Sequence, residues 1–232
     1  MRAFLAGACM RRLVAAAVLC LAVAAPALAA SNPALWKVRD ADTTVYLFGT
    51  IHAMKEGVQW HFPALDKALT ASGTLYIEAA DINPKTLQPL VVKYGLDPAH
   101  PLSGKLGKQE IALLKQAATE LGIHGGMTTL NMMKPWLAGI TIASAPLIKA
   151  GYDPKLGVDK QLQARFEQAG KPIKGLESAK QQILFLSQLP ESVQLKLLQK
   201  SLHEYAHADT MLTRLVHAWK RGDTKALART IV

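Results

Sequence analysis

The sequence predicts a helix-rich chain of α/β (α+β) class with a small mixed sheet, and three observations support this prediction. Few segments have the short apolar character of strands, most of the chain has helical periodicity, and helices separate most of the strand-like segments. In open α/β sheets, functional sites collect at the carboxyl ends of the strands. We therefore expect the strand ends of this sheet to form the site.

The first 29 residues have the pattern of a secretory signal peptide. Residues 1–12 carry three arginines and no acid, residues 13–23 form a short apolar run, and small residues at 27–29 supply a cleavage site. We therefore expect an exported protein, periplasmic or secreted, with one domain at residues 30–232. No later apolar stretch approaches the length of about 18 residues needed to span a bilayer, so we do not expect an integral membrane protein.

Four segments are predicted to be strands. Residues 35–39 and 44–48 are expected to form a hairpin, because Asp40-Ala41-Asp42 between them is a tight-turn sequence. Residues 74–78 and 172–177 are compact apolar runs, and each ends on a glutamate. These two runs lie far apart in the sequence, with helices between them.

Helices are expected where apolar residues recur at helical spacing or in long apolar runs. The predicted ranges are 62–71, 84–94, 108–121, 130–149, 155–169, 179–189 and 191–220. Pro135 and Pro146 predict a kink or a split in the most apolar of them.

Composition limits the classes of partner. The formal net charge is +10, and beyond the signal peptide 24 basic side chains face 17 acidic ones. The lysines are scattered, with no basic stripe interleaved with aromatics, so we expect no nucleic-acid partner. Both cysteines, Cys9 and Cys20, lie in the signal peptide, so the domain is expected to fold without disulfides. The sequence leaves the oligomeric state open.

Three strands end at side chains that bind divalent metals. His52 follows the strand that begins at Thr44, and Glu78 and Glu177 end the other two. One imidazole and two carboxylates suit zinc, manganese or cobalt. Gly49 near the first strand end permits a bend or a close backbone approach. A single glutamate at a strand end is more often a surface or capping residue, so the prediction depends on the three together.

A second candidate metal site is the HEYAH stretch, which matches the H-E-x-x-H pattern of zinc peptidases. On one helix, His203 and His207 would share a face, and the glutamate between them would polarise a metal-bound water. A zincin needs a third ligand, and the short metzincin extension would place it at Thr213. The two histidines also lie beside the apolar stripe of their helix, so the strand-end site is favoured.

Several motifs along the chain resemble the TraB/GumN family, which also includes the Tiki proteins. The resemblance begins with Leu47-Phe48-Gly49-Thr50-Ile51-His52, a G-x-x-H motif, and covers residues from about 35 to 222. Further matching features, in order, are Glu78, Lys134-Pro135-Trp136, Gly157-Val158-Asp159, Gly170-Lys171-Pro172, Leu176-Glu177-Ser178 and Gln181-Gln182. The family normally carries a second G-x-x-H in its C-terminal part, which is absent here, so we expect a member that lacks this portion.

The resemblance implies an exported metal-dependent hydrolase, most simply a peptidase acting on a peptide or another small exported substrate. It implies His52 as the prime metal ligand, Glu78 and Glu177 as ligands or general base, and Lys134 and Trp136 as supporting residues. Two alternatives stay open: a non-catalytic periplasmic protein that sequesters a peptide or glycan, and a zincin at residues 203–207. Substrate and metal identity are not predicted.

Overall fold

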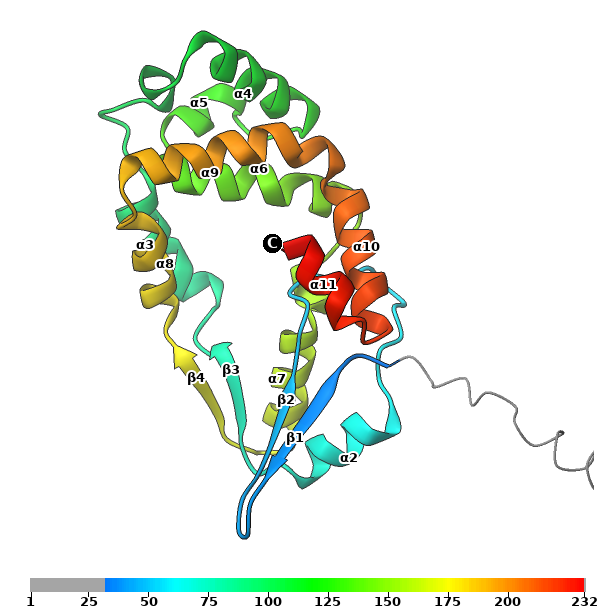
Figure 1. The fold of residues 1–232 in the computed structure, drawn as a ribbon. Helices are drawn as coiled ribbons and strands as arrows, with labels where there is room; N and C mark the ends of the chain where they lie inside the picture. Colours follow the sequence, from blue (N-terminus) through cyan, green and yellow to red (C-terminus); the bar gives the residue numbers. More distant parts are fainter. Residues whose placement is uncertain (1–31, 232) are drawn as a thin grey trace, which may run out of the picture. The chain divides into compact units, whose positions relative to one another are not determined.

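The predicted helix-rich α+β class is confirmed by the computed structural model, which describes residues 32–231. Helices make up most of this range, and the strands are short (Figure 1). The predicted signal peptide, residues 1–29, lies outside the described residues. Among the described helices, none combines the length and the apolar character needed to cross a bilayer.

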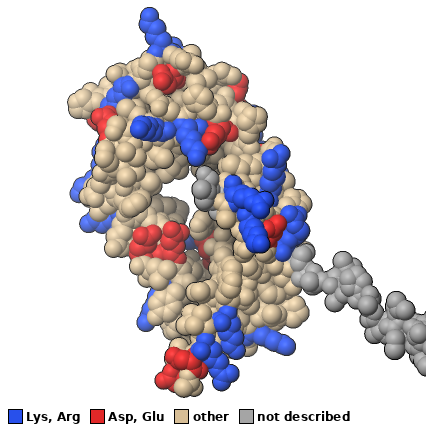
Figure 2. All heavy atoms as spheres, in the orientation of Figure 1, with Lys and Arg blue, Asp and Glu red and all other residues tan. Residues whose placement is uncertain are grey.

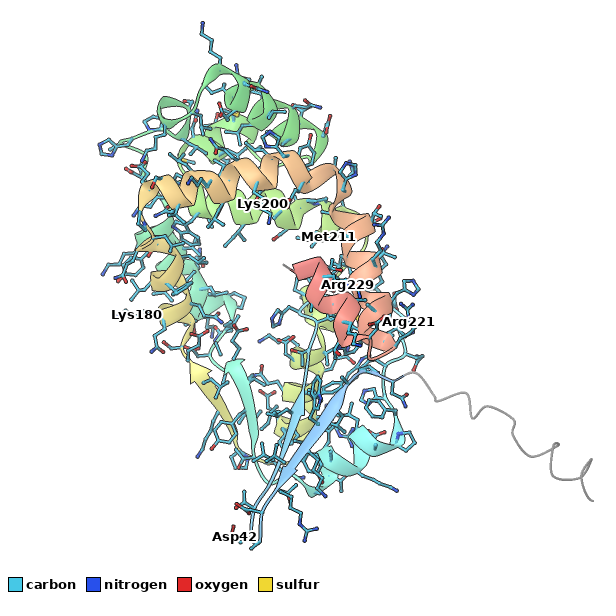
Figure 3. The ribbon with its side chains drawn as sticks, in the orientation of Figure 1. Asp42, Lys180, Lys200, Met211, Arg221 and Arg229 are labelled. Atoms are coloured by element: carbon cyan, nitrogen blue, oxygen red, sulfur yellow. The ribbon has the colours of Figure 1, made fainter. Side chains whose placement is uncertain are left out.

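The predicted hairpin is confirmed. Strands β1 (Leu35–Arg39) and β2 (Thr44–Phe48) pair antiparallel, with Leu35 opposite Phe48. The Asp40 carboxylate closes the turn by accepting a 2.7 Å hydrogen bond from the Thr43 N–H, and Asp42 marks the hairpin tip in Figure 3. An aspartate that bonds the backbone two or three residues on is a common way to fix a tight turn, which explains why this element was predictable.

The other two predicted strands also form, but in a sheet of their own. Strand β3 (Leu75–Ala79) pairs in parallel with β4 (Ile173–Glu177). Within residues 32–231 no hydrogen-bonded ladder joins this pair to the hairpin, so the single mixed sheet expected from the sequence is instead two sheets of two strands. One edge of β2 and one edge of β3 are therefore unpaired in the described structure.

Most predicted helices form close to their expected positions. Among the described residues the α-helices are α2 (Pro63–Ala71), α3 (Pro84–Gly95), α4 (Lys108–Glu120), α5 (Gly126–Asn131), α6 (Pro135–Lys149), α7 (Val158–Gln168), α8 (Ala179–Ser187), α9 (Glu191–Glu204), α10 (Ala208–Lys220) and α11 (Thr224–Ile231). Short 3₁₀ turns, η1 (Leu102–Lys105), η2 (Pro154–Leu156) and η3 (Tyr205–His207), join some of them.

Two of the predicted helices are divided. The helix expected at 130–149 is split before Pro135, one of the two prolines that predicted a kink or a split: residues 130–131 end α5, and Pro135 opens α6, which continues through Pro146. Proline suits the first turn of a helix, where the backbone N–H groups have no partner within the helix. The expected continuous helix at 191–220 is broken at Tyr205, where α9 gives way to the 3₁₀ turn before α10 begins.

Two hydrophobic clusters hold these elements. One lies around the hairpin, α2, α7 and α10, where the Phe48 and Trp60 rings stack with centroids 6.1 Å apart and Trp219 packs beside both. The other lies between α4, α6 and α9. Gly139 allows α6 and α9 to approach closely, since a Cβ there would lie 3.3 Å from the Leu198 Cα.

The strand faces opposite these clusters remain exposed. Trp36 pairs with Leu47, and Val38 pairs with Val45, so these four apolar side chains share one face of the hairpin. Each has about half of its surface or more exposed. Tyr76 of β3 and Leu176 of β4 are also exposed. The two sheets therefore present apolar surface that no described residue covers.

Positive charge is spread over several elements, as the sequence predicted. On the face drawn in Figure 2, lysine and arginine side chains form separate groups. Figure 3 locates Lys180 on α8, Lys200 on α9 and Arg221 after α10.

Candidate functional site

The segment that follows β2 is held in place by two backbone contacts. The Trp219 indole N–H donates to the Gly49 carbonyl at 2.7 Å, and the Val158 N–H donates to the Ile51 carbonyl at 2.8 Å. Gly157 lies directly against the His52 backbone, where a Cβ would come within 2.7 Å of the His52 carbonyl carbon. These contacts fix His52 beyond the end of its strand, beside the start of α7.

The His52 imidazole lies between two carboxylates. Its Nδ1 is 3.1 Å from Asp159 Oδ1, and its Nε2 is 3.6 Å from Glu78 Oε2. Because an ionised carboxylate only accepts hydrogen bonds, Nδ1 carries the proton and donates a hydrogen bond to Asp159. The Asp159 side chain is 21% exposed, whereas those of His52 and Glu78 are 67% and 59% exposed. The Asp159 contact is therefore the more shielded one, and Nε2 is accessible to a ligand.

The two carboxylates favour the protonated form of the imidazole. The hydrogen bond to Asp159 raises the pKa of His52 most strongly, burial opposes that rise, and the charges of Asp159 and Glu78 add to it. A ligand that binds Nε2 must displace its proton, so binding there strengthens as the pH rises.

His52, Glu78 and Asp159 line a cavity of about 470 Å³. This volume lies within the usual range for small-ligand sites. Much of its wall is apolar, formed by Tyr76, Ile77, Ala79, Ile82, Pro154 and Leu176. The cavity therefore combines one histidine–carboxylate cluster with largely apolar walls, as binding and catalytic sites commonly do.

Glu177, the third predicted site residue, is not brought to His52. In the β3–β4 register Glu177 lies opposite Ala79, so its side chain is on the same face as that of Ala79. Glu78, one residue earlier, points to the opposite face because side chains alternate along a strand. The Glu177 carboxylate accepts a 2.9 Å hydrogen bond from the Gln182 amide, and it does not line the cavity.

Asp159 was not predicted as a site residue, although the Gly157-Val158-Asp159 motif contains it. It stands in the first turn of α7, where an acidic residue is favourable for the helix itself. Its contact with His52 joins residues 107 positions apart, which no local pattern in the sequence indicates.

Comparison with known proteins agrees with this arrangement of motifs. The model of the TraB/PrgY/gumN family matches residues 34–231. The chain belongs to this family. It is 23% identical over 200 residues to the uncharacterized protein YbaP of Escherichia coli (strain K12) and, equally, to that of Shigella flexneri. Each match covers 75% of this chain and 74% of the relative. No solved structure matches the chain.

In this TraB/PrgY/gumN family member, the supporting residues predicted from the sequence have structural roles. Gly49 presents its carbonyl to Trp219, as described above. The Lys134 N–H donates to the Gly95 carbonyl at 2.7 Å and so ties the start of α6 to the end of α3. Trp136 is almost fully buried, and its indole N–H donates to the Tyr94 carbonyl. Neither Lys134 nor Trp136 lines the cavity.

The HEYAH stretch does not have the geometry that the zincin pattern requires. His203 lies in α9, whereas His207 ends the 3₁₀ turn before α10, so the two are not on one face of a continuous helix. His203 Nδ1 is 2.7 Å from the Gln199 carbonyl, to which it donates. The physical basis for the match, two histidines one α-helical turn apart, is therefore missing.

The family resemblance implies a divalent cation. His52 Nε2 and Glu78 Oε2 are spaced so that they could fill two of its coordination positions. Two ligands about 2.1 Å from a tetrahedral cation lie about 3.4 Å apart, close to the 3.6 Å between Nε2 and Glu78 Oε2. Asp159 on Nδ1 supplies the outer carboxylate that commonly orients a metal-binding histidine. Within residues 32–231 no group of three or more His, Cys, Asp or Glu side chains is arranged to hold a metal. A cation held by this pair would need its remaining ligands from water or substrate.

Proposed function

We propose that this chain is a metal-dependent hydrolase, most simply a peptidase, whose site consists of His52, Glu78 and Asp159. One observation carries the proposal: a histidine oriented by a shielded aspartate presents its other nitrogen to a glutamate inside an apolar-walled cavity. The signal-peptide pattern of residues 1–29 supports the further proposal that the protein acts after export.

Each of the three side chains has a separate part in this proposal. Asp159 holds the proton on Nδ1, so the Nε2 lone pair faces the cavity. Glu78 contributes a second donor, and its carboxylate is also the group placed to accept a proton from an attacking water. A bound divalent cation, zinc, manganese or cobalt, would polarise the scissile carbonyl and acidify that water.

A second candidate function is non-catalytic binding of a peptide or glycan in the same cavity. The observation that favours it is the missing third ligand. A catalytic zinc is usually held by three protein side chains, and the described residues place only two here. Under this alternative, His52 and Glu78 would bind ligand polar groups directly.

Metal content of the purified protein is the first test. The protein is loaded with zinc, manganese or cobalt, dialysed, and compared with His52→Ala and with the control His207→Ala. We expect bound metal in the wild type and in His207→Ala and its loss in His52→Ala. A well-folded wild type that retains no metal would refute the metal-dependent proposal.

Two further variants separate the proposed roles. Glu78→Gln is expected to abolish hydrolysis of a mixed peptide substrate while peptide binding survives, whereas hydrolysis unaffected by the substitution would exclude Glu78 as the base. Glu177→Gln is expected to retain the metal, because Glu177 does not line the cavity and its carboxylate accepts a hydrogen bond from the Gln182 amide. Loss of metal in Glu177→Gln would instead support the three-residue site predicted from the sequence.

A further inference from the structure

The cavity that holds His52 also contains a cation. Among the described residues that line it, Lys160 is the one lysine or arginine. It stands in the first turn of α7, directly after Asp159, whose carboxylate bonds to the His52 imidazole. Two neighbouring residues of α7 therefore bring side chains of opposite charge to the same cavity. Asp159 has a part in the candidate site described above, whereas Lys160 has none so far.

Helix stability does not explain the position of Lys160. The N-terminal end of a helix carries partial positive charge, so it favours an acid such as Asp159 and disfavours a cation. Lys160 is also partly buried, which costs an ammonium part of its hydration. The presence of a lysine here is therefore better explained by what its ammonium contacts.

Two oxygen atoms hold the Lys160 ammonium in place. Its Nζ donates to the Ile82 carbonyl at 3.0 Å and to Gln163 Oε1 at 3.2 Å. The Gln163 amide is itself oriented, because its Nε2 donates to Glu167 Oε1 at 3.0 Å and so leaves Oε1 for the lysine. An ammonium has three N–H groups, and these contacts use two of them. Because Lys160 lines the cavity, the third remains for a ligand bound there.

The loop that carries the Ile82 carbonyl is fixed on both sides. The Asp81 carboxylate accepts a 2.8 Å hydrogen bond from the Ala179 N–H at the start of α8. The Asn83 side chain caps α3 by accepting a 3.1 Å hydrogen bond from the Thr86 N–H. Since these two residues flank Ile82, its carbonyl has a set position, and the ammonium bonded to it is held ready for a ligand. An anion that binds there loses less conformational entropy than one that must first order a mobile lysine.

The charges around Lys160 select the kind of anion. Its two acceptors are uncharged, so neither of them neutralises the ammonium. The Asp159 carboxylate is bonded to His52 at 3.1 Å, and Glu78 lies 3.6 Å from the other nitrogen of the same ring. One ammonium beside two carboxylates can balance one added negative charge but not two. The cavity therefore favours a monoanion such as a carboxylate over a dianionic phosphate.

We propose that Lys160 forms an anion subsite of the His52 cavity and selects substrates that carry a carboxylate close to the bond that is cleaved. The proposal names the charge of the substrate, and in that respect it rests on the proposed function. The apolar walls of the cavity would cover the uncharged remainder of such a substrate. Lys160 is thus a residue that determines specificity, while His52 and Glu78 keep the parts proposed above.

The test uses three probes that differ only in the group attached to a benzyl unit. They are phenylacetate, its uncharged amide phenylacetamide, and benzylphosphonate, which can carry a second negative charge. Each is titrated into the isotope-labelled protein in the presence of a chelator, and the NMR shifts of the Asp159 and Lys160 amide signals give the dissociation constants. We expect phenylacetate to bind at least about tenfold more tightly than phenylacetamide, the low end for a hydrogen bond to a charged group, because Lys160 is only partly buried. Equal affinities for these two probes, no binding of phenylacetate, or tighter binding of benzylphosphonate would overturn the proposal.

Protein variants assign this preference to Lys160. Lys160→Met keeps the length of the side chain and removes its charge, so the affinities for phenylacetate and phenylacetamide should then agree within about twofold. Lys160→Arg should retain the preference. The control Lys155→Met removes the charge of an exposed lysine that does not line the cavity, and it should also retain the preference.

A purely structural role of Lys160 gives a different result. If the lysine only held the Ile82 carbonyl, Lys160→Met would weaken the binding of both probes by the same factor, and that outcome would overturn the proposal. If Lys160→Met does not fold, the comparison of the probes in the wild type still decides.

The anion subsite and the proposed function fail separately, because the probe measurements need neither metal nor hydrolysis. A wild type that retains no metal but shows the preference that depends on Lys160 would remove the proposed function and leave the subsite. Metal retention and hydrolysis without that preference would do the opposite.

Discussion

Gly157→Ala should displace the segment that carries His52, because Gly157 lies against the backbone of that residue. A Cβ there would come 2.7 Å from the His52 carbonyl carbon and 3.1 Å from Asp159 Oδ1. The backbone at Gly157 has φ −53° and ψ 143°, a conformation open to alanine, so the cost is steric rather than torsional.

The size of the effect follows from what must move. The close neighbours are backbone atoms of His52, which the Val158–Ile51 hydrogen bond holds in place, so the added methyl group cannot be relieved by a side-chain rotation. Overpacking of this kind typically costs about 1–3 kcal/mol of unfolding free energy. In a domain of this size each kcal/mol lowers Tm by roughly 2–4 °C.

Urea unfolding of Gly157→Ala and of the control Gly104→Ala measures this cost. A Cβ on Gly104 meets no atom within 4 Å, so that variant should match the wild type within about 0.5 kcal/mol. Metal affinity should fall in Gly157→Ala and not in Gly104→Ala, because only the former moves His52. The reasoning is refuted if the two variants unfold at the same urea concentration.

Two other substitutions have predictable effects on stability. Trp219→Phe should lower the free energy of unfolding by about 1–3 kcal/mol, since it removes the hydrogen bond to Gly49 and leaves space beside Phe48; urea unfolding that coincides with that of the wild type would contradict this. Asp159→Asn should lower the free energy of unfolding by an amount that depends on pH. The variant is compared with the wild type in the presence of a chelator, which removes bound metal from both. Because the folded pKa of His52 is raised, that stabilisation is full below its ordinary pKa of about 6.5 and is lost as the pH rises through the raised value. The difference in unfolding free energy between the two proteins should therefore narrow with rising pH. A difference that widens would show that Asp159 does not stabilise the fold through protonated His52.

The parts of the fold that the sequence predicted are those set by local rules. The hairpin depends on Asp40 and on two short apolar runs, and all of these lie within fifteen consecutive residues. The meeting of His52 with Glu78 was expected from the tendency of strand ends to gather at one edge of a sheet, and the two residues do meet, although their strands belong to two separate sheets. Neither inference needed the position of any distant residue.

The parts that the sequence did not predict depend on distant contacts. Glu177 and Glu78 look equivalent in the sequence, and only the register of a parallel pair separated by about a hundred residues places their side chains on opposite faces. The start of α7 meets His52 through a backbone bond to Ile51, which no local pattern encodes.

The break between α9 and α10 is a second case of this kind. Residues 205–207 contain no glycine or proline, so helical periodicity continues through them. The break coincides with Tyr205, whose nearly buried ring places its hydroxyl 2.6 Å from Glu120 on α4. A contact between distant helices accompanies the end of α9, and the two histidines of HEYAH are separated as a result.

The parallel pairing of β3 with β4 also sets an order of events during synthesis. The hairpin can close as soon as Phe48 has emerged, because its partner strand precedes it directly. Leu75 must wait for Ile173, about a hundred residues later. At a synthesis rate of about 5–20 residues per second, β3 stays without its partner for roughly 5–20 seconds. Its edges are unpaired throughout that interval, so the nascent chain is open to chaperones, proteases and misassociation until β4 is made.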